Sequence, residues 1–86
     1  MYTVFIEKRI LKDLESLPNA VVERIEGVFI SLQDKPRSQG SQKLRGFLSR
    51  YRLRQGNCRI VYEIDEERKA VRILIVGHRK DAYREM

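Results

Sequence analysis

The sequence predicts a small α+β domain, in the order β-α-α-β-β-β, with a helical hairpin on one face of a mostly antiparallel sheet. Three observations lead to this fold class. Two segments in the first half carry apolar residues at helical spacing, two segments in the second half alternate polar and apolar residues around a run of turn residues, and short apolar runs begin and end the series. The 86 residues are enough for one modest core, so we expect residues 1–86 to form a single domain.

The first half of the chain supplies one strand and both helices. Residues 2–6 form a short extended run with apolar side chains on both faces. We therefore expect this strand to be paired within a sheet and covered by helices. Residues 7–17 and 20–34 carry apolar side chains every three to four positions, as amphipathic helices do. Pro18 and Asn19 separate them, and proline is tolerated in the first turn of a helix. We therefore expect two antiparallel helices with a tight connection.

A basic hairpin is the central feature of the second half. Residues 50–54 (RYRLR) put three arginines on one face of an extended strand and two apolar side chains on the other. Residues 58–64 (CRIVYEI) alternate in the same way, with Arg59 on the polar side. The turn residues 55–57 (QGN) between them predict a hairpin, because Gly and Asn both accept positive φ angles. The hairpin would bring four guanidinium groups together on one sheet surface.

The remaining segments complete the sheet. Residues 35–42 contain proline, glycine and two serines, which predicts a loop. Residues 70–76 (AVRILIV) are apolar at most positions and β-branched at several, as a central strand would be. Residues 78–86 form a short polar tail with at most one helical turn.

Positive charge is concentrated in the middle of the chain. The formal net charge is +6, yet residues 35–62 alone contain eight basic and no acidic side chains. Like charges on one sheet face are destabilising, so an anionic partner is the expected reason for them. A nucleic acid or an acidic protein segment fits this distribution. The basic residues are Lys35, Arg37, Lys43, Arg45, Arg50, Arg52, Arg54 and Arg59.

Composition excludes several other classes of protein. Hydrophobic residues make up 42% and charged residues 35% of the chain, and no apolar run approaches the roughly 18 residues of a membrane span. The N-terminal segment lacks the apolar core of a secretory signal, so a cytoplasmic protein without a membrane partner is expected. Cys58 cannot form an intramolecular disulfide, and one cysteine beside one histidine offers no metal-ligand set. We expect no metal ion and no cofactor.

Several motifs resemble one known family. The run KLRG at residues 43–46 precedes an arginine-rich strand, CRIVYEI is a variant of a YR-hydrophobic-hydrophobic-Y strand, and the chain ends in VGHRKDAYRE and one further residue. With the element order, these motifs resemble the RelE family of bacterial and archaeal toxin–antitoxin systems, within the RelE/ParE superfamily. The resemblance implies a toxin that cleaves messenger RNA in the ribosomal A site without a metal ion and so inhibits translation. It also implies an inhibitory antitoxin with an acidic toxin-binding segment.

The resemblance also implies roles for particular residues. The family's essential strand arginine falls on Arg59, its second essential arginine on Arg79, and its near-terminal tyrosine, which stacks on the base or positions the RNA, on Tyr83. Two basic positions on the preceding strand are lysines in the best-known member, where they are thought to transfer protons. Arginine occupies these positions here and is a poor general base, because it keeps its proton at neutral pH. The family's basic strand positions fall on Arg50, Arg52 and Arg54.

The chemistry of RNA cleavage fits these residue types. Attack of a ribose 2′-OH on the adjacent phosphate builds negative charge that fixed guanidinium groups can stabilise. The 2′-OH must also lose a proton, and the titratable residues near Arg59 and Arg79 in sequence are Glu63, Asp65 and His78. Of these, His78 has the most suitable ordinary pKa for proton transfer near neutral pH. Such a weak acid–base set would need a larger machine to position the RNA. The predicted catalytic residues are Arg59, Arg79, Tyr83, Arg52 and His78, and the predicted RNA-binding residues are Lys43, Arg45, Arg50 and Arg54.

Other readings of the same residues remain open. The chain could be a ParE-like inhibitor of DNA gyrase that cleaves nothing. It could also be a detoxified remnant or a plain RNA-binding protein, as the loss of the strand lysines suggests. The strand arginines could form a solvated face or an antitoxin-binding surface, and Arg59 could pair with a carboxylate such as Glu63. His78 and Tyr83 could both be structural.

Overall fold

The computed structural model describes residues 1–37 and 40–78. In this part of the chain, two helices and five strands follow one another in the order β-α-α-β-β-β-β. The predicted α+β class, helical hairpin and basic hairpin are confirmed. The elements are β1 (Thr3–Ile6), α1 (Lys8–Glu15), α2 (Asn19–Asp34), β2 (Ser41–Lys43), β3 (Arg50–Gln55), β4 (Cys58–Asp65) and β5 (Ala70–His78).

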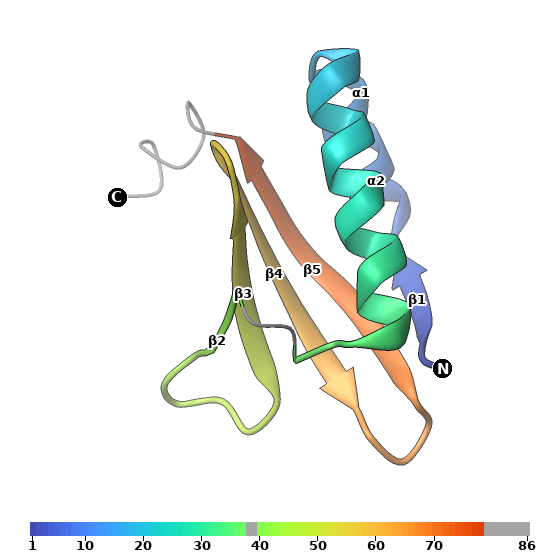
Figure 1. Cartoon of the computed structure of the whole chain (residues 1–86), viewed down its shortest axis with the longest axis vertical. Helices are drawn as coiled ribbons and strands as arrows, with labels where there is room; N and C mark the ends of the chain where they lie inside the picture. Colours follow the sequence, from blue (N-terminus) through green and yellow to red (C-terminus); the bar gives the residue numbers. More distant parts are fainter. Residues whose placement is uncertain (38–39, 79–86) are drawn as a thin grey trace.

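The five strands form one sheet in the order β1-β5-β4-β3-β2 (Figure 1). β1 pairs with β5 in parallel, and all the other neighbours pair antiparallel. The helical hairpin connects β1 to the far side of the sheet and lies on one face of it (Figure 1). The short strand β2 was missed, because the predicted loop over residues 35–42 includes its first two residues. A three-residue edge strand has too few positions to show an alternating pattern.

β1 differs from its prediction in how it is covered. It lies at the edge of the sheet with β5 as its neighbour, and the helices cover one of its faces. Val4 and Ile6 pack against the core, whereas Phe5 points to the other face and is 53% exposed. The expectation that helices cover this apolar strand was therefore right for one face and wrong for the other.

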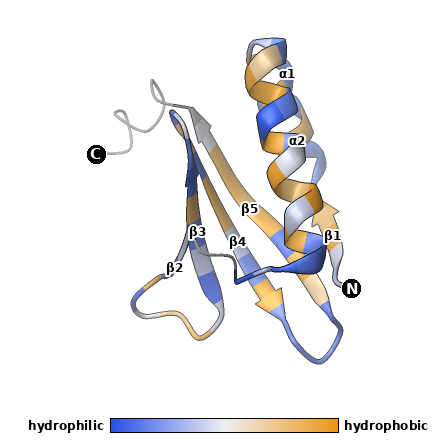
Figure 2. Cartoon of the chain, in the orientation of Figure 1, coloured by the Kyte–Doolittle hydropathy of each residue, from blue (hydrophilic) through white to orange (hydrophobic). Residues whose placement is uncertain are grey.

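The core lies between the two helices and the sheet (Figure 2). The buried side chains of the helices recur at the spacing that the sequence predicts, because that spacing puts them on one side of each helix. They meet the apolar side chains of β4 and β5, and the hydrophobic residues along these strands are orange in Figure 2. The fully buried residues with less than 2% exposure are Tyr62, Ile10, Ile25, Leu32, Ile60, Ile73 and Val71. None of the described helices is both long and apolar enough to cross a membrane.

Tyr62 ties the segment after α2 to the sheet. Its ring is completely buried, and its hydroxyl donates a hydrogen bond of 2.6 Å to the carbonyl oxygen of Pro36. Tyr51 on the neighbouring strand stacks against it, with ring centroids 5.9 Å apart. Burial is the main reason that the pKa of Tyr62 is raised, so the hydroxyl keeps its proton and remains a donor. This contact fixes the segment that follows α2 against the sheet.

Glu66, on the turn between β4 and β5, is the centre of a surface cluster that links this turn to Tyr2 before β1 and to the segment after α2. Its carboxylate accepts hydrogen bonds from Arg37 Nη1 and from the Tyr2 hydroxyl, each at 2.8 Å. Lys69 Nζ lies 3.4 Å from the same carboxylate. The bond from Arg37 is the first cause of a pKa of about 2 for Glu66, and the Tyr2 hydroxyl is the second. All these groups are at the surface, so solvent screens each contact.

The lowered pKa of Glu66 predicts a pH-dependent contribution to stability. Because the carboxylate is favoured in the folded state, its contribution is present above the unfolded pKa and is lost as the pH falls towards about 2. Glu66→Gln should therefore have a lower urea midpoint than the wild type at pH 7, and the difference should shrink below about pH 4.5. Glu67→Gln, on the same exposed turn, is the control and should match the wild type. A pH-independent difference for Glu66→Gln would contradict this assignment.

Candidate nucleic-acid interface

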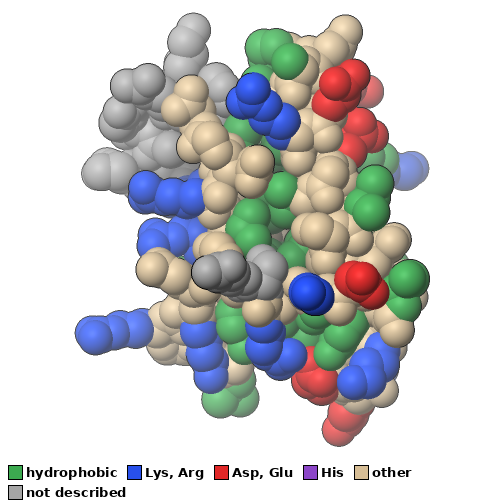
Figure 3. All heavy atoms as spheres, viewed as in Figure 1, with side chains coloured by type: hydrophobic (Ala, Val, Ile, Leu, Met, Phe, Trp, Pro, Cys, Tyr) green, Lys and Arg blue, Asp and Glu red, His purple; other side chains and the backbone are tan. Residues whose placement is uncertain are grey.

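The sheet face that points away from the helices carries the predicted arginines. Residues opposite one another in an antiparallel pair share a face, and the β3–β4 register sets Arg54 opposite Arg59. Arg50 and Arg52 alternate with the inward-facing Tyr51 and Leu53 and so lie on the same face as Arg54. In the space-filling view, Lys and Arg side chains project along the side of the molecule that is farthest from the helices (Figure 3). We call Arg50, Arg52, Arg54 and Arg59 the arginine face.

A groove crosses this face. It has a volume of about 490 Å³ and an apolar floor formed by Val61, Leu74 and Ile75 of the two central strands. Phe47 and Leu44 of the loop between β2 and β3 contribute to its wall. Four arginines, Arg9, Arg50, Arg52 and Arg59, also line it, and we call it the arginine groove. A low-polarity floor strengthens the field of the guanidinium groups around it, because it displaces water from between them and a bound anion.

Arg9 is the one member of the groove that sequence reasoning missed. It lies at the start of α1, and the polar residues of an amphipathic helix ordinarily face water. Its Nη2 atom donates a hydrogen bond of 2.5 Å to the carbonyl oxygen of Leu74. Leu74 lies where the β4–β5 register shifts, beyond the last pair between β1 and β5. Arg9 thus binds a carbonyl of β5 beyond the end of β1, a contact that no local pattern in the sequence indicates.

Arg50 is held by an internal carboxylate. Its Nε atom lies 3.2 Å from Glu63, and the Nη2 atom of Arg72 lies 2.7 Å from the other carboxylate oxygen of Glu63. Hydrogen bonds from Arg72 first and Arg50 second lower the pKa of Glu63. Glu63 is therefore ionised at neutral pH and occupied by two guanidinium groups, which makes it a weak general base. The guanidinium of Arg50 also lies over the ring of Phe47, with its carbon 4.4 Å from the ring centroid.

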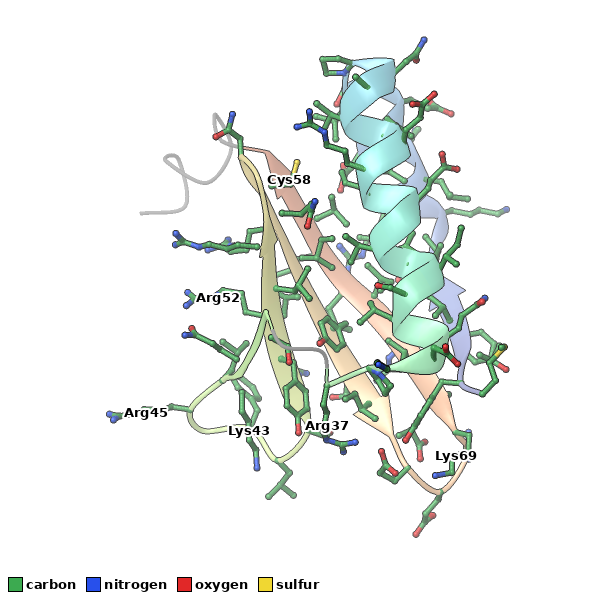
Figure 4. All side chains as sticks on the ribbon, in the orientation of Figure 1. Arg37, Lys43, Arg45, Arg52, Cys58 and Lys69 are labelled. Carbon is green, nitrogen blue, oxygen red and sulfur yellow. The ribbon has the colours of Figure 1, made fainter. Side chains whose placement is uncertain are left out.

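Arg52 connects the arginine groove to a second hollow. Its Nη2 atom donates a hydrogen bond of 2.7 Å to the side-chain oxygen of Gln42, its register partner on β2. The second hollow, of about 300 Å³, is lined by Arg52, Arg54, Gln42 and Gly40. Figure 4 shows the side chain of Arg52 extending away from the helices. The missed strand β2 therefore has a role in the site, since it orients one of the predicted arginines.

The other predicted site residues are distributed differently. Lys43 pairs with Tyr51 in the β2–β3 register, which places it on the opposite face of the sheet from Arg52. Arg45 is exposed on the loop after β2, where it points away from the helices (Figure 4). His78 is the last residue of β5, with its backbone opposite Cys58. Arg79 and Tyr83 lie outside the described residues, so their proposed roles remain predictions.

The arrangement can bind and polarise a phosphodiester. Planar guanidinium groups on rigid strands can donate paired hydrogen bonds to phosphate oxygens without reorganising. Burial raises the pKa of the Cys58 thiol, which keeps it protonated on the side of the sheet that faces the core. Among the described residues, no group of three or more His, Cys, Asp and Glu side chains is arranged to hold a metal ion.

Comparisons with known proteins agree on the family. The family model described as the ParE toxin of the type II toxin–antitoxin system parDE matches residues 4–83. The chain is 34% identical to toxin RelG of Mycobacterium tuberculosis, over 96% of this chain and 97% of the relative. It is 30% identical to the mRNA interferase toxin RelE of Escherichia coli, over 92% of this chain and 84% of the relative.

The comparison of folds indicates the same family. A chain of the archaeal RelE–RelB complex from Pyrococcus horikoshii matches this structure with a TM-score of 0.78 and 30% sequence identity, over 91% of this chain and 94% of that chain. The chain is therefore a RelE-type toxin of a toxin–antitoxin system and belongs to the RelE/ParE superfamily.

Proposed function

We propose that this toxin is an endoribonuclease that cleaves messenger RNA in the A site of the ribosome and so inhibits translation. The observation that carries the proposal is the arginine groove, in which four guanidinium groups surround an apolar floor. The floor and three of the four arginines belong to strands of the sheet. The name of the Escherichia coli relative, an mRNA interferase, supports the same activity. Cleavage would follow attack of a ribose 2′-OH on the adjacent phosphate, and it would need no metal ion.

The groove would act mainly by electrostatic stabilisation. In the transition state, negative charge would build on the phosphoryl oxygens, and Arg59 and Arg52, which line the groove, would bind those oxygens. Arginine keeps its proton at neutral pH and therefore contributes little as a base. Among the neighbours considered from the sequence, Glu63 is ionised but held by two arginines, which leaves Asp65 and His78. Of these two, His78 is the candidate for proton transfer, because an imidazole ordinarily titrates closest to neutral pH. Arg79 would supply a second guanidinium, and Tyr83 would position a base.

A weak acid–base set explains why the ribosome should be required. Holding the reacting atoms in line supplies a large part of a rate enhancement, and a surface groove cannot do this alone for a flexible RNA. The ribosome would supply a message that is already positioned, and the toxin would supply charge. Arg54 on the arginine face and Arg45 on the loop after β2 would contact the surrounding RNA backbone, whereas Lys43 lies on the opposite face of the sheet from Arg52.

The natural inhibitor is proposed to be an antitoxin with an acidic segment. Such a segment would neutralise the arginine face, and its disorder in the free state would let it wrap the toxin. The solved relative from Pyrococcus horikoshii is a RelE–RelB complex, which supports a partner of this kind. Raising the salt concentration should weaken RNA binding by counterion release, whereas apolar contacts with the antitoxin would persist.

A ParE-like inhibitor of DNA gyrase is the second candidate. The description of the matching family model favours it, since that model is named for ParE. The two activities leave different products. Primer extension on message after induction of the toxin should show cuts in phase with codons, and purified toxin should cut ribosome-bound message but not the same message alone. Intact message together with inhibited DNA supercoiling would overturn the nuclease proposal and support gyrase inhibition.

A further inference from the structure

The loop between β2 and β3 exposes apolar side chains beside the most basic surface of the chain. Phe47 is 46% exposed and Leu48 is 94% exposed. Of these two, only Phe47 lines the arginine groove. An exposed aromatic ring on the wall of a cationic groove costs solvation free energy, so a flat apolar group of a ligand is the natural reason for its position.

Phe47 and Arg50 form a layered pair, which we call the stacking platform. The guanidinium carbon of Arg50 lies 4.4 Å from the centroid of the Phe47 ring, which is within stacking range. The Nε atom of the same guanidinium lies 3.2 Å from the carboxylate of Glu63. Glu63 is in turn bound to Arg72 at 2.7 Å. The guanidinium of Arg50 is thus held in place by both a ring and a carboxylate, and the platform is ordered before any ligand arrives.

These contacts distinguish Arg50 from the other arginines of the groove. Its charge is already partly balanced by Glu63, so it offers less to a phosphate than Arg52, which donates a hydrogen bond to the uncharged amide of Gln42. Its flat group, layered on a ring, is instead suited to extending a stack. The β3 strand therefore presents two kinds of arginine on one face, one layered on a ring and paired with a carboxylate and one bound to a neutral amide.

We propose that a nucleobase of single-stranded RNA stacks on the platform, against the exposed surface of Phe47, while a neighbouring phosphate binds Arg52 and Arg59. The inference rests on the proposed function in that it takes RNA as the ligand. The groove volume of about 490 Å³ lies within the range of small-ligand sites and so has room for a nucleotide. Single-stranded RNA is required, because a base must be free of its duplex to stack on a protein ring.

The platform also predicts tolerance for different bases at that position. Stacking uses the flat surface that every base has, so it favours purines only through their larger area and does not read hydrogen-bonding edges. Phe47 would thus place the RNA strand in the groove without selecting a codon. It is a positioning residue for the proposed reaction.

The test is a binding experiment with short RNA that carries 2-aminopurine, a fluorescent adenine analogue whose emission is quenched when it stacks. The full chain is titrated into the labelled RNA at low salt, without ribosomes. We expect quenching with the wild type and with Phe47→Trp. We expect Phe47→Leu, which keeps an apolar side chain but no ring, to lose the quenching and to bind about tenfold more weakly. Leu48→Ala, one position further along the same loop, is the matched control and should behave as the wild type.

Three other outcomes would overturn the inference. Equal quenching by wild type and Phe47→Leu would place the base elsewhere, and no quenching by a wild type that binds the RNA would do the same. Unchanged RNA quenching with weaker binding of an antitoxin peptide by Phe47→Leu would assign the ring to a protein ligand instead. The result is separable from the proposed function. A wild type that quenches the probe but cuts no ribosome-bound message would contradict the nuclease proposal and would still support the stacking platform.

Discussion

Replacement of Arg59 by alanine should lower the rate of message cleavage on the ribosome by roughly a hundredfold or more, which is the usual loss when one fixed donor to a developing oxyanion is removed. Arg59 lies on β4 in the middle of the sheet, directly opposite Arg54, and its side chain lines the arginine groove. A strand in the middle of the sheet holds the guanidinium more rigidly than a loop would. The effect should therefore appear mainly in the rate of the chemical step.

Three variants make this prediction specific. Arg59→Lys keeps the charge but not the planar fork, so it should recover only part of the rate. Arg68→Ala, on the exposed turn between β4 and β5 and outside the arginine groove, removes the same charge and should cut as the wild type does. Arg79→Ala should resemble Arg59→Ala if the family resemblance assigns its role correctly. Single-turnover cleavage measured by primer extension gives the rates, and circular dichroism verifies the folds. A folded Arg59→Ala toxin that cuts at the wild-type rate would refute the assignment.

Local periodicity in the sequence was sufficient to predict which sheet face carries most of the candidate site. Alternation at period two determines which side chains of β3 share a face, and the turn residues after β3 determine that β4 pairs with it. The arginines at positions 50, 52 and 54 therefore had to lie together with Arg59. The helices could be predicted in the same way, because their apolar residues recur every three to four positions. That spacing puts them on one side of an α-helix.

What the sequence could not supply depends on contacts between distant segments. Arg9 enters the groove because α1 crosses the end of β1 beside β5, and nothing near Arg9 in the sequence indicates that crossing. Lys43 appeared to belong with the strand arginines by charge, but its register with Tyr51 puts it on the other face. Glu63 appeared available as a base, yet two arginines hold it. Charge and proximity in sequence suggested the roles of Lys43 and Glu63, and only the pairing of the strands showed where these two side chains lie.

The site also has a cost that the rest of the fold must offset. Cationic side chains that face one another across strands repel, and the pair formed by Arg54 and Arg59 is of this kind. Glu63 relieves part of the repulsion at one end of the arginine face, where it binds Arg50 and Arg72. The remainder is balanced by the apolar core on the opposite side of the same strands. Stability of this toxin therefore depends heavily on a few large buried side chains, of which Tyr62 is the largest.

Tyr62→Ala should be the most destabilising single change within the sheet. Removing a fully buried aromatic side chain costs about 3–5 kcal/mol, which is a large share of the 5–15 kcal/mol that stabilises a typical domain. The change would also remove the stacking partner of Tyr51 and the donor to Pro36. We expect this variant to be largely unfolded or to melt at a far lower urea concentration than the wild type.

Tyr62→Phe separates the hydrogen bond from the packing. It keeps the ring but leaves the carbonyl oxygen of the buried Pro36 without its 2.6 Å donor, which should cost about 1–3 kcal/mol. Tyr51→Phe is the matched control: its hydroxyl accepts a bond from Arg37 at the surface, so its loss should cost less than about 0.5 kcal/mol. Urea unfolding followed by circular dichroism measures both. Equal midpoints for Tyr62→Phe and the wild type would show that the hydrogen bond to Pro36 contributes nothing to stability. Since β2 carries the glutamine that orients Arg52, a loosened chain in Tyr62→Phe should also lower cleavage without touching any residue of the groove.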